Sequence, residues 1–385
     1  MAHIRMLDPA TRPVEPPAGR LQILRRDCPE AGTVVAFRNQ RLTDLASVLR
    51  GRPAADAPRL ARRLQPASGW AQGLACLGAI EAAAGRRPDP DTARARALLA
   101  QAESALGMIT HAGLDWPRLF GWEPRLRHLR YARAALDALV ARLWRGRDPL
   151  DPAARAAAAF EAEPAASALI EALETAVLPR APVDPARLAD WAARDRAPFA
   201  RLIRAASRLC LAAPPPDAVP VPGLSDLAAA LAADPGFGRA PHLGGVAGDP
   251  TAFARLPAVP GAARFGPVGA RLLAQAGQAQ AAIEALARLD PPPVATSAPC
   301  PGTGAALVEG VRGPLVHLVR LDGGDRIDLV ASVAPTEWML HPAGPLAATL
   351  AALPAERLMR DAPLVLAAHD PGTRVTLRQE ATAES

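Results

Sequence analysis

The sequence contains no lysine, so arginine carries all of the strong positive charge of this 385-residue chain. The 44 arginines exceed the 38 acidic residues and give a formal net charge of +6, but they are scattered among acidic neighbours such as Asp44, Asp56 and Glu81. A protein that binds nucleic acid usually concentrates its positive charge on one face. We therefore expect no nucleic-acid partner.

Cysteine is scarce, and long hydrophobic runs are absent. The four cysteines, at positions 28, 76, 210 and 300, lie far apart and form no Cys-x-x-Cys pair, which argues against a disulfide framework and fits a reducing compartment. The N-terminus has no hydrophobic segment of the signal-peptide kind, and no apolar run approaches the length of a membrane span. These features predict a cytoplasmic protein without membrane insertion.

Aromatic residues make up only 4% of the chain, although half of its residues are hydrophobic. Alanine therefore carries much of the apolar content, and because it is the best helix former and has little volume, it favours closely spaced helices. The 42 prolines interrupt helices, since each removes a backbone donor. The composition predicts a mainly α member of the α+β class, with small β pieces near both termini.

Hydrophobic periodicity locates the expected elements along the chain. Helical spacing recurs over residues 41–63 (with a break at 51–53), 69–85, 91–112, 123–145, 153–178, 185–211, 267–289 and 345–359. Alternating β-rich segments at 19–24, 33–37, 315–321 and 326–333 predict strands, and the last two are joined by the turn 322–325.

We expect a single domain over residues 1–385. It would consist of an N-terminal β segment (1–40), a helical core (41–300), a C-terminal hairpin and helix (301–378) and a short tail (379–385).

The segment Gly302–Gly313 is the most specific motif of the chain. It resembles the "G-x-G-x-x-E-x-P-R-G" segment of [NiFe]-hydrogenase large subunits, with Val311 in place of the proline. The resemblance implies a large-subunit-like helical core and places Arg312 beside an Fe(CN)2CO group. A planar guanidinium with several donors suits the nitrogen of a cyanide ligand.

A second motif follows the predicted hairpin. The segment Ala334–Pro342 resembles the large-subunit "P-T-x-W" segment. The resemblance implies that Pro335 and Thr336 face a cyanide ligand, because the threonine hydroxyl and nearby backbone groups supply donors.

Large subunits hold nickel and iron through the thiolates of two cysteine motifs, and this chain lacks those cysteines. Its Asp370–Arg378 segment corresponds to "D-P-C-x-x-C-x-x-H/R", and its Gln65–Gln72 segment corresponds to "C-G-x-C-x-x-x-H". Soft thiolates suit these metals, and amides or hydroxyls do not replace them. We therefore expect no nickel. The degenerate ligand positions are Gln65, Ser68, Gln72, Gly372, Val375 and Arg378.

Three further side chains are candidate contacts of the iron unit. Glu15 lies in a stretch that resembles the large-subunit opening, where the resemblance implies a proton-relay glutamate. Cys300 precedes the turn at Gly302 and is expected to approach Arg312. Cys76 lies one helical turn beyond Gln72, and it is either a ligand on the same face or a small buried residue of an alanine-rich helix.

Histidine is a common metal ligand, but the surroundings of two histidines in the sequence favour a structural role. The segment from Glu103 to His111 resembles an "E-R-x-x-x-H" helix of the large subunits, and we interpret His111 as a hydrogen-bonded histidine. His317 alternates with Leu315 and Val319 on a predicted strand, which indicates a packed histidine.

A chain that keeps the large-subunit motifs and loses their cysteines resembles the HupK/HoxV-type accessory proteins of hydrogenase formation. The resemblance implies a non-catalytic scaffold or chaperone that holds Fe(CN)2CO transiently, with maturation chaperones and the hydrogenase large subunit as partners. Two alternatives stay open. One is a metal-free module that mimics the large subunit to bind maturation chaperones. The other is a divergent metalloenzyme that uses histidine and aspartate ligands.

Overall fold

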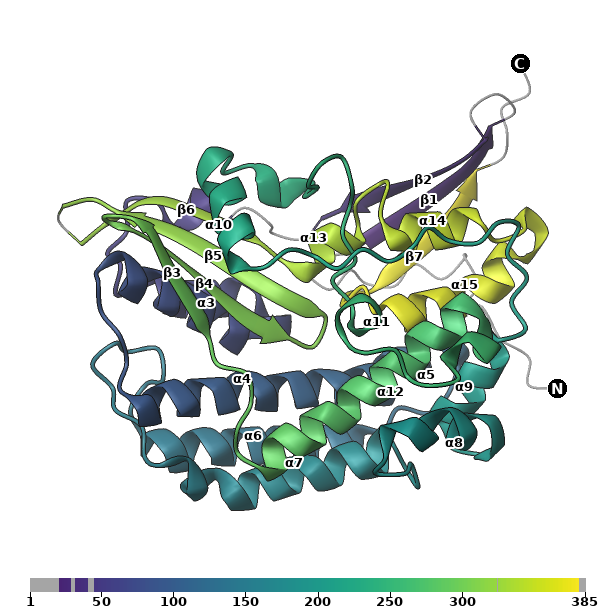
Figure 1. The fold of residues 1–385 in the computed structure, drawn as a ribbon, viewed down its shortest axis with the longest axis horizontal. Coiled ribbons are helices and arrows are strands. Elements are labelled where there is room, and N and C mark those ends of the chain that lie inside the picture. Colours follow the sequence, from purple (N-terminus) through teal and green to yellow (C-terminus); the bar gives the residue numbers. More distant parts are fainter. Residues whose placement is uncertain (1–20, 29–31, 41–44, 324, 381–385) are drawn as a thin grey trace.

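A computed structural model describes residues 21–28, 32–40, 45–323 and 325–380 of the chain (Figure 1). Helices dominate, and the strands form two separate small sheets. This arrangement confirms the predicted mainly α member of the α+β class.

Four long helices form a layer along the lower side of the molecule in Figure 1. The helix α4 (Pro90–Thr110) packs against α6 (Leu126–Trp144), α7 (Glu163–Ala176) and α12 (Gly266–Ala287). Its first turn is capped by Asp89, whose carboxylate accepts a hydrogen bond from the Thr92 N–H at 3.0 Å. Because many of its side chains are alanine, α4 can be buried by neighbours on several sides.

The larger sheet contains four antiparallel strands in sequence order. They are β3 (Ala295–Cys300), β4 (Thr303–Gly310), β5 (Gly313–Leu321) and β6 (Ile327–Val333). The helix α3 (Gly69–Ala83) packs on β4 and β5 and also contacts α4. The turn between β4 and β5, residues 311–312, is therefore carried to one end of this sheet.

The smaller sheet joins the two ends of the described chain. Strand β1 (Leu21–Cys28) pairs antiparallel with β2 (Gly32–Asn39) and parallel with β7 (Val375–Glu380). Arg25 of β1 is buried and donates a hydrogen bond to the carbonyl of Leu353 at 2.7 Å, which fixes this sheet to the C-terminal helices.

Shorter helices connect these parts, and a π-helical turn, His111–Asp115, continues α4 into α5. The shorter helices are α1 (Ala46–Leu49), α2 (Ala57–Leu64), α5 (Trp116–Phe120), α8 (Leu188–Arg194), α9 (Pro198–Ala206), α10 (Leu224–Ala233), α11 (Ala252–Arg255), α13 (Pro335–Met339), α14 (Pro345–Ala351) and α15 (Leu358–His369).

Most predicted elements are found, and the differences follow from proline and from pairing between distant segments. The prediction of one helix over 185–211 is wrong, because the chain leaves helical geometry before Pro198, which starts α9. The helix predicted over 153–178 begins only at Glu163. Strands β3, β4 and β7 were not expected, and β7 runs to Glu380, into the predicted tail.

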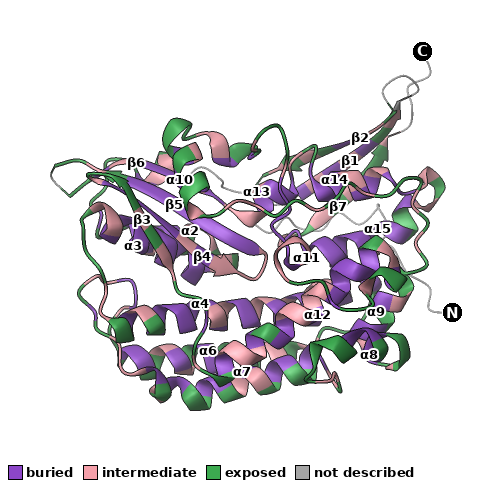
Figure 2. Ribbon diagram, in the orientation of Figure 1, coloured by how far each residue is buried: buried purple, intermediate pink, exposed green. Residues whose placement is uncertain are grey.

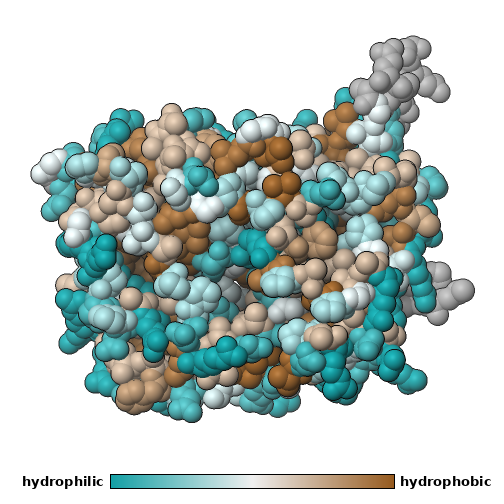
Figure 3. All heavy atoms as spheres, in the orientation of Figure 1, coloured by the Kyte–Doolittle hydropathy of each residue, from teal (hydrophilic) through white to brown (hydrophobic). Residues whose placement is uncertain are grey.

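The surface and the interior are separated as expected for a folded chain. Buried residues line the inner faces of α3, α4, α15 and β5 (Figure 2). On the face drawn in Figure 3, apolar and polar side chains are interspersed. Among the described residues, none of the helices combines the length and the hydrophobicity that crossing a membrane requires.

A buried ion pair joins α3 to α4. Arg96 donates to both carboxylate oxygens of Glu81, at 2.7 and 3.1 Å, and both side chains are about 5% exposed. A bidentate pair of this kind satisfies two charges that burial would otherwise make costly. The pair therefore fixes the position of α3 on α4.

We predict that Arg96→Ala lowers the free energy of unfolding by about 3–5 kcal/mol, because it leaves the Glu81 carboxylate buried without its partner. Arg94→Ala on the same helix is the control, since Arg94 forms an exposed pair with Asp290 and should cost less than about 1 kcal/mol. Urea denaturation measures both values, and equal losses would contradict the prediction.

Candidate functional site

One face of α4 brings the scattered motifs together. Glu103, Gly107 and His111 lie at four-residue intervals, so they follow one another along the same face of the helix. Each of them meets a different segment of the chain. The three contact points span about 12 Å at the rise of an α-helix.

The first contact holds the degenerate N-terminal cysteine motif. The carboxylate of Glu103 accepts hydrogen bonds from the backbone N–H groups of Trp70 and Ala71, at 2.7 and 2.8 Å. These donors belong to the first turn of α3, directly after Gln65 and Ser68. Burial raises the pKa of Glu103 to about 7, against the opposing effect of the two N–H groups and of nearby Arg62.

The second contact holds the arginine motif. Val311 packs onto Gly107 so closely that a Cβ at position 107 would lie 2.9 Å from a Val311 methyl group. The amide of Gln278, on α12, donates to the carbonyl of Val311 at 2.9 Å. The residue that replaces the large-subunit proline is thus held between α4 and α12.

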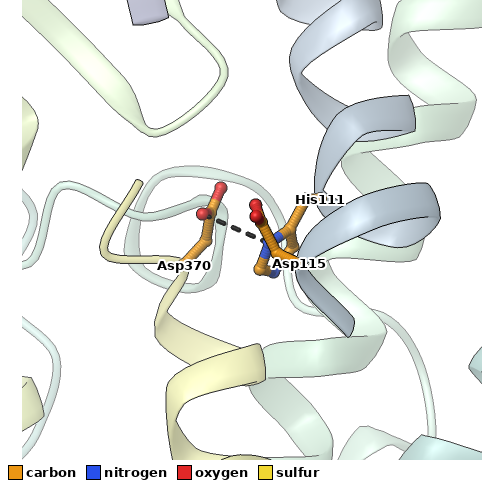
Figure 4. Close-up of side chains that lie close together, drawn as sticks. All are labelled: His111, Asp115 and Asp370. Atoms are coloured by element: carbon orange, nitrogen blue, oxygen red, sulfur yellow. Dashed lines mark hydrogen bonds and ion pairs between the residues drawn. The ribbon is translucent and has the colours of Figure 1, made fainter. Parts of the chain in front are cut away.

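The third contact joins α4 to the chain after α15. Nδ1 of His111 lies 3.3 Å from a carboxylate oxygen of Asp370 and 3.4 Å from one of Asp115 (Figure 4). Nε2 of His111 lies 2.9 Å from the carbonyl oxygen of Ala367 and donates to it. Burial by itself lowers the pKa of His111, but Asp370 and Asp115 raise it above its ordinary value overall.

Arg312 completes this contact from the other side. Its Nη2 donates to the carboxylate of Asp370 at 3.0 Å, and its Nε donates to the carbonyl of Asp370 at 3.1 Å. Burial raises the pKa of Asp370, but Arg312 and His111 lower it below its usual value, so the carboxylate is ionised. Asp370 therefore accepts hydrogen bonds from Arg312 and from the Gly372 N–H, the latter at 3.2 Å, and it also lies beside the His111 ring.

Gly372, at the position of the first C-terminal cysteine of the large subunits, leaves room for Arg312. Its backbone has φ +67°, and a Cβ there would lie 2.5 Å from Nε and 2.7 Å from Cζ of Arg312. No side chain fits at this position unless the guanidinium moves. Arg312 thus lies where the Cβ of a cysteine would be.

A cavity of about 40 Å³ borders these groups. One water needs about 10–15 Å³ by the same measure, so the cavity has room for about three water-sized groups. Its apolar side includes Met108, Trp116 and Phe199. Its polar lining consists of His111, Thr251, Gln275, Gln278, Arg312, His369 and Asp370.

The other degenerate ligand positions have structural surroundings. Gln72 is buried, and its side-chain oxygen accepts a hydrogen bond from Nε2 of His317 at 2.7 Å. Burial lowers the pKa of His317 to about 4, so the ring is neutral, and the prediction of a packed histidine is confirmed. Val375 starts β7 and packs against the core, whereas Arg378 is exposed on the same strand.

The proline–threonine motif lies at the same end of the sheet as Arg312. Val333 at the end of β6 pairs with Val316 near the start of β5, and α13 begins with Pro335 directly afterwards. Thr336 is buried, but neither Pro335 nor Thr336 lines the described cavity. Their role beside a cyanide stays a prediction.

The expected approach of Cys300 to Arg312 is wrong. Cys300 is exposed and pairs with Thr303 at the start of β4, whereas Arg312 follows the far end of that strand. Eight residues of extended chain separate the two ends by about 25 Å. The prediction placed the two residues close together because the sequence pattern did not identify β4 as a strand.

Cys76 lies in the hydrophobic core, away from the cavity. Cys76 is fully buried in an apolar cluster with Ala79, Ile80 and Val319, and burial raises the pKa of its thiol to about 12. This setting favours the interpretation of Cys76 as a small packed residue. Glu15 lies outside the described residues.

Sequence reasoning missed Glu103 and Asp115 as parts of the site. Asp115 follows His111 by four residues, a spacing that brings side chains together on one turn of a helix. Glu103 carried a weaker signal, because its backbone partners lie 33 and 32 residues away in α3. The whole arrangement offers donors for an anionic ligand at Arg312, and nitrogen and oxygen ligands at His111, Asp115 and Asp370.

Comparison with known proteins gives relatives over most of the chain. It is 31% identical to the hydrogenase expression/formation protein HupK of Azotobacter vinelandii, covering 91% of this chain and 96% of the relative. It is also 31% identical to HupV of Azotobacter chroococcum mcd 1, covering 86% and 89%, and 29% identical to HoxV of Cupriavidus necator, covering 88% and 91%. The chain belongs to the HupK/HoxV/HupV family of hydrogenase expression/formation proteins.

Solved structures show which fold this chain has. The chain resembles the reduced, active Ni-Fe-Se hydrogenase of Desulfomicrobium baculatum with a TM-score of 0.59 at 14% identity, covering 88% of this chain and 94% of that one. It resembles the NAD+-reducing [NiFe]-hydrogenase with a TM-score of 0.55 at 15% identity, with the same coverage. The family member thus has the large-subunit fold, as expected from its motifs. No protein-family model matches the sequence.

We predict that Gly372→Ala costs about 1–3 kcal/mol more than Gly121→Ala, because overpacking against the Arg312 guanidinium adds to the backbone strain. Gly121 is a matched control: it has the same φ of +67°, but a Cβ there meets nothing within 4 Å. Chemical denaturation measures both losses. Equal losses would show that Arg312 does not occupy this space.

The pKa of Glu103 predicts a pH-dependent stability. Because its folded pKa of about 7 exceeds the unfolded value of about 4.3, its contribution is full below pH 4.3 and is lost as the pH rises through 7. We therefore expect Glu103→Gln to flatten the fall in melting temperature over this interval. Glu284→Gln, an exposed carboxyl on α12, is the control. An unchanged slope in Glu103→Gln would contradict the assignment.

Proposed function

We propose that this chain is a non-catalytic accessory protein in [NiFe]-hydrogenase formation that carries an Fe(CN)2CO unit before the unit passes to the hydrogenase large subunit. Membership of a family of hydrogenase expression/formation proteins supports the accessory role. The large-subunit fold supports a role in which the chain stands in for the large subunit during assembly.

The observation that carries the proposal is the unequal loss of the two sides of the site. Arg312, the group suited to a cyanide nitrogen, is partly buried beside a cavity and held in place by Asp370. The four thiolate positions carry Gln65, Ser68, Gly372 and Val375, and the space at Gly372 is filled by the guanidinium. The chain keeps the arginine suited to diatomic ligands, and it lacks the thiolates that would hold nickel.

The proposed partners follow from the shape of the chain. A maturation chaperone that recognises an unfinished large subunit would find a similar fold here, and delivery of the unit requires contact with the large subunit itself. We place this exchange in the cytoplasm.

A metal-free interaction module is the second candidate function. It is favoured by one observation: Arg312 already donates two hydrogen bonds to Asp370, so the described site is stable without a diatomic ligand. A divergent metalloenzyme ranks third.

Infrared spectroscopy tests the proposal. Protein purified anaerobically from cells competent in hydrogenase maturation should show two cyanide bands and one carbonyl band. The bands should be weaker in Arg312→Lys, which keeps the charge but loses the planar donors. Cys300→Ser is the control and should leave the bands unchanged, because Cys300 lies at the other end of β4.

The outcomes separate the candidates. Wild-type protein that co-purifies with maturation partners but shows no cyanide or carbonyl band would contradict the carrier and favour the metal-free module. Bands of full intensity in Arg312→Lys would show that Arg312 does not contact the bound unit.

A further inference from the structure

The side chains of His111, Asp115 and Asp370 form a cluster that could hold a metal ion. The three residues come from the π-helical turn after α4 and from the residue after α15, and Figure 4 shows their side chains converging. One nitrogen and two oxygen donors lie within 4.8 Å of one another. Imidazole and carboxylate are ligands of non-haem ferrous iron.

The tautomer of His111 leaves the correct nitrogen for a metal. The carbonyl oxygen of Ala367 can only accept a hydrogen bond, so Nε2 carries a proton. Nδ1 therefore faces two carboxylate oxygens, and a cation must lie between them, either a proton on the ring or a metal ion. A metal-binding histidine commonly donates its other ring nitrogen to a backbone carbonyl in this way.

The distances are close to those of neighbouring positions in an octahedron. With bonds of about 2.1 Å, adjacent ligand atoms are about 3 Å apart. Nδ1 of His111 lies 3.3 and 3.4 Å from the two carboxylates, and the three ligand atoms all lie within 4.8 Å of one another, so the side chains would have to close around the ion. The same oxygen of Asp370 also accepts hydrogen bonds from Nη2 of Arg312 at 3.0 Å and from the backbone N–H of Gly372 at 3.2 Å, so iron bound there would displace one of these donors.

An unpartnered histidine nitrogen borders the cavity that His111 and Asp370 also line. His369 is 1% exposed, and its Nδ1 donates to the carbonyl of Val365 at 2.9 Å. Its Nε2 is buried and has no hydrogen-bond partner among the described residues. A buried lone pair left free in this way indicates a site shaped for an additional group.

We propose that His111, Asp115 and Asp370 ligate the iron of the carried unit through one nitrogen and two oxygens, in place of the lost thiolates. This inference rests on the proposed function. Three protein ligands of a six-coordinate iron leave three positions, which match two cyanides and one carbonyl. Two cyanides neutralise ferrous iron, so the unit adds no net charge beside Arg312. Binding releases the proton on Nδ1, and iron keeps its oxidation state.

Two measurements on the full-length chain test this assignment. The first titrates Fe2+ alone into anaerobic, metal-free protein by calorimetry. The second records the infrared bands of protein from maturation-competent cells. Asp115→Asn is the main variant, because its side chain is 34% exposed and the change keeps its shape. His111→Gln is the second variant, and Asp190→Asn, an exposed aspartate paired with Arg264, is the control. Thermal melting confirms that each variant is folded.

We expect one Fe2+ per wild-type chain, affinity at least tenfold lower in both variants, and infrared bands that are lost with it, while Asp190→Asn behaves as wild type. Wild-type bands that persist unchanged in both folded variants would overturn this ligand set and leave the proposed function intact. Absence of bands in wild type, with Fe2+ binding that depends on Asp115, would overturn the carrier function and support the iron site. Absence of both would overturn both.

Discussion

The contact between Arg312 and Asp370 is the constraint on which the candidate site depends. It fixes the arginine motif to the end of α15, and it brings an ionised carboxylate to His111 on α4. Gly372 allows it, because any Cβ there would displace the guanidinium. A cysteine at this position and the present Arg312 conformation exclude one another. The loss of the thiolate and the position of the arginine are therefore two aspects of one arrangement.

The helix α4 supports this contact and determines what lies around it. Glu103, Gly107 and His111 contact three segments that resemble metal-site motifs of the large subunits, although these segments lie far apart in the sequence. The ion pair between Glu81 and Arg96 holds α3 on the same helix. The fold thus keeps the geometry of the site independently of the metal ligands. This independence explains how this chain can lack the cysteines and still have the large-subunit fold.

Much of this could be predicted from the sequence, and the failures have physical causes. The order of the motifs placed Arg312 correctly at the end of a hairpin, and hydrophobic periodicity located α4 and α12. The pairing of β1 with β7 could not be predicted from the sequence, because the register between strands more than 300 residues apart is decided by tertiary packing. Cys300 was misplaced because β4, rich in glycine and alanine, lacks the pattern of a strand. The grouping of Asp115 with Asp370 needed the fold.

We infer that this site binds iron through nitrogen and oxygen in place of sulfur, and that it keeps Arg312 beside the diatomic ligands. Iron K-edge X-ray absorption of protein purified anaerobically from maturation-competent cells measures this most directly, because sulfur and lighter neighbours scatter differently. The account predicts short iron–carbon distances from the cyanide and carbonyl ligands, completed by nitrogen or oxygen neighbours and by no sulfur. A sulfur neighbour bound to the iron would contradict it.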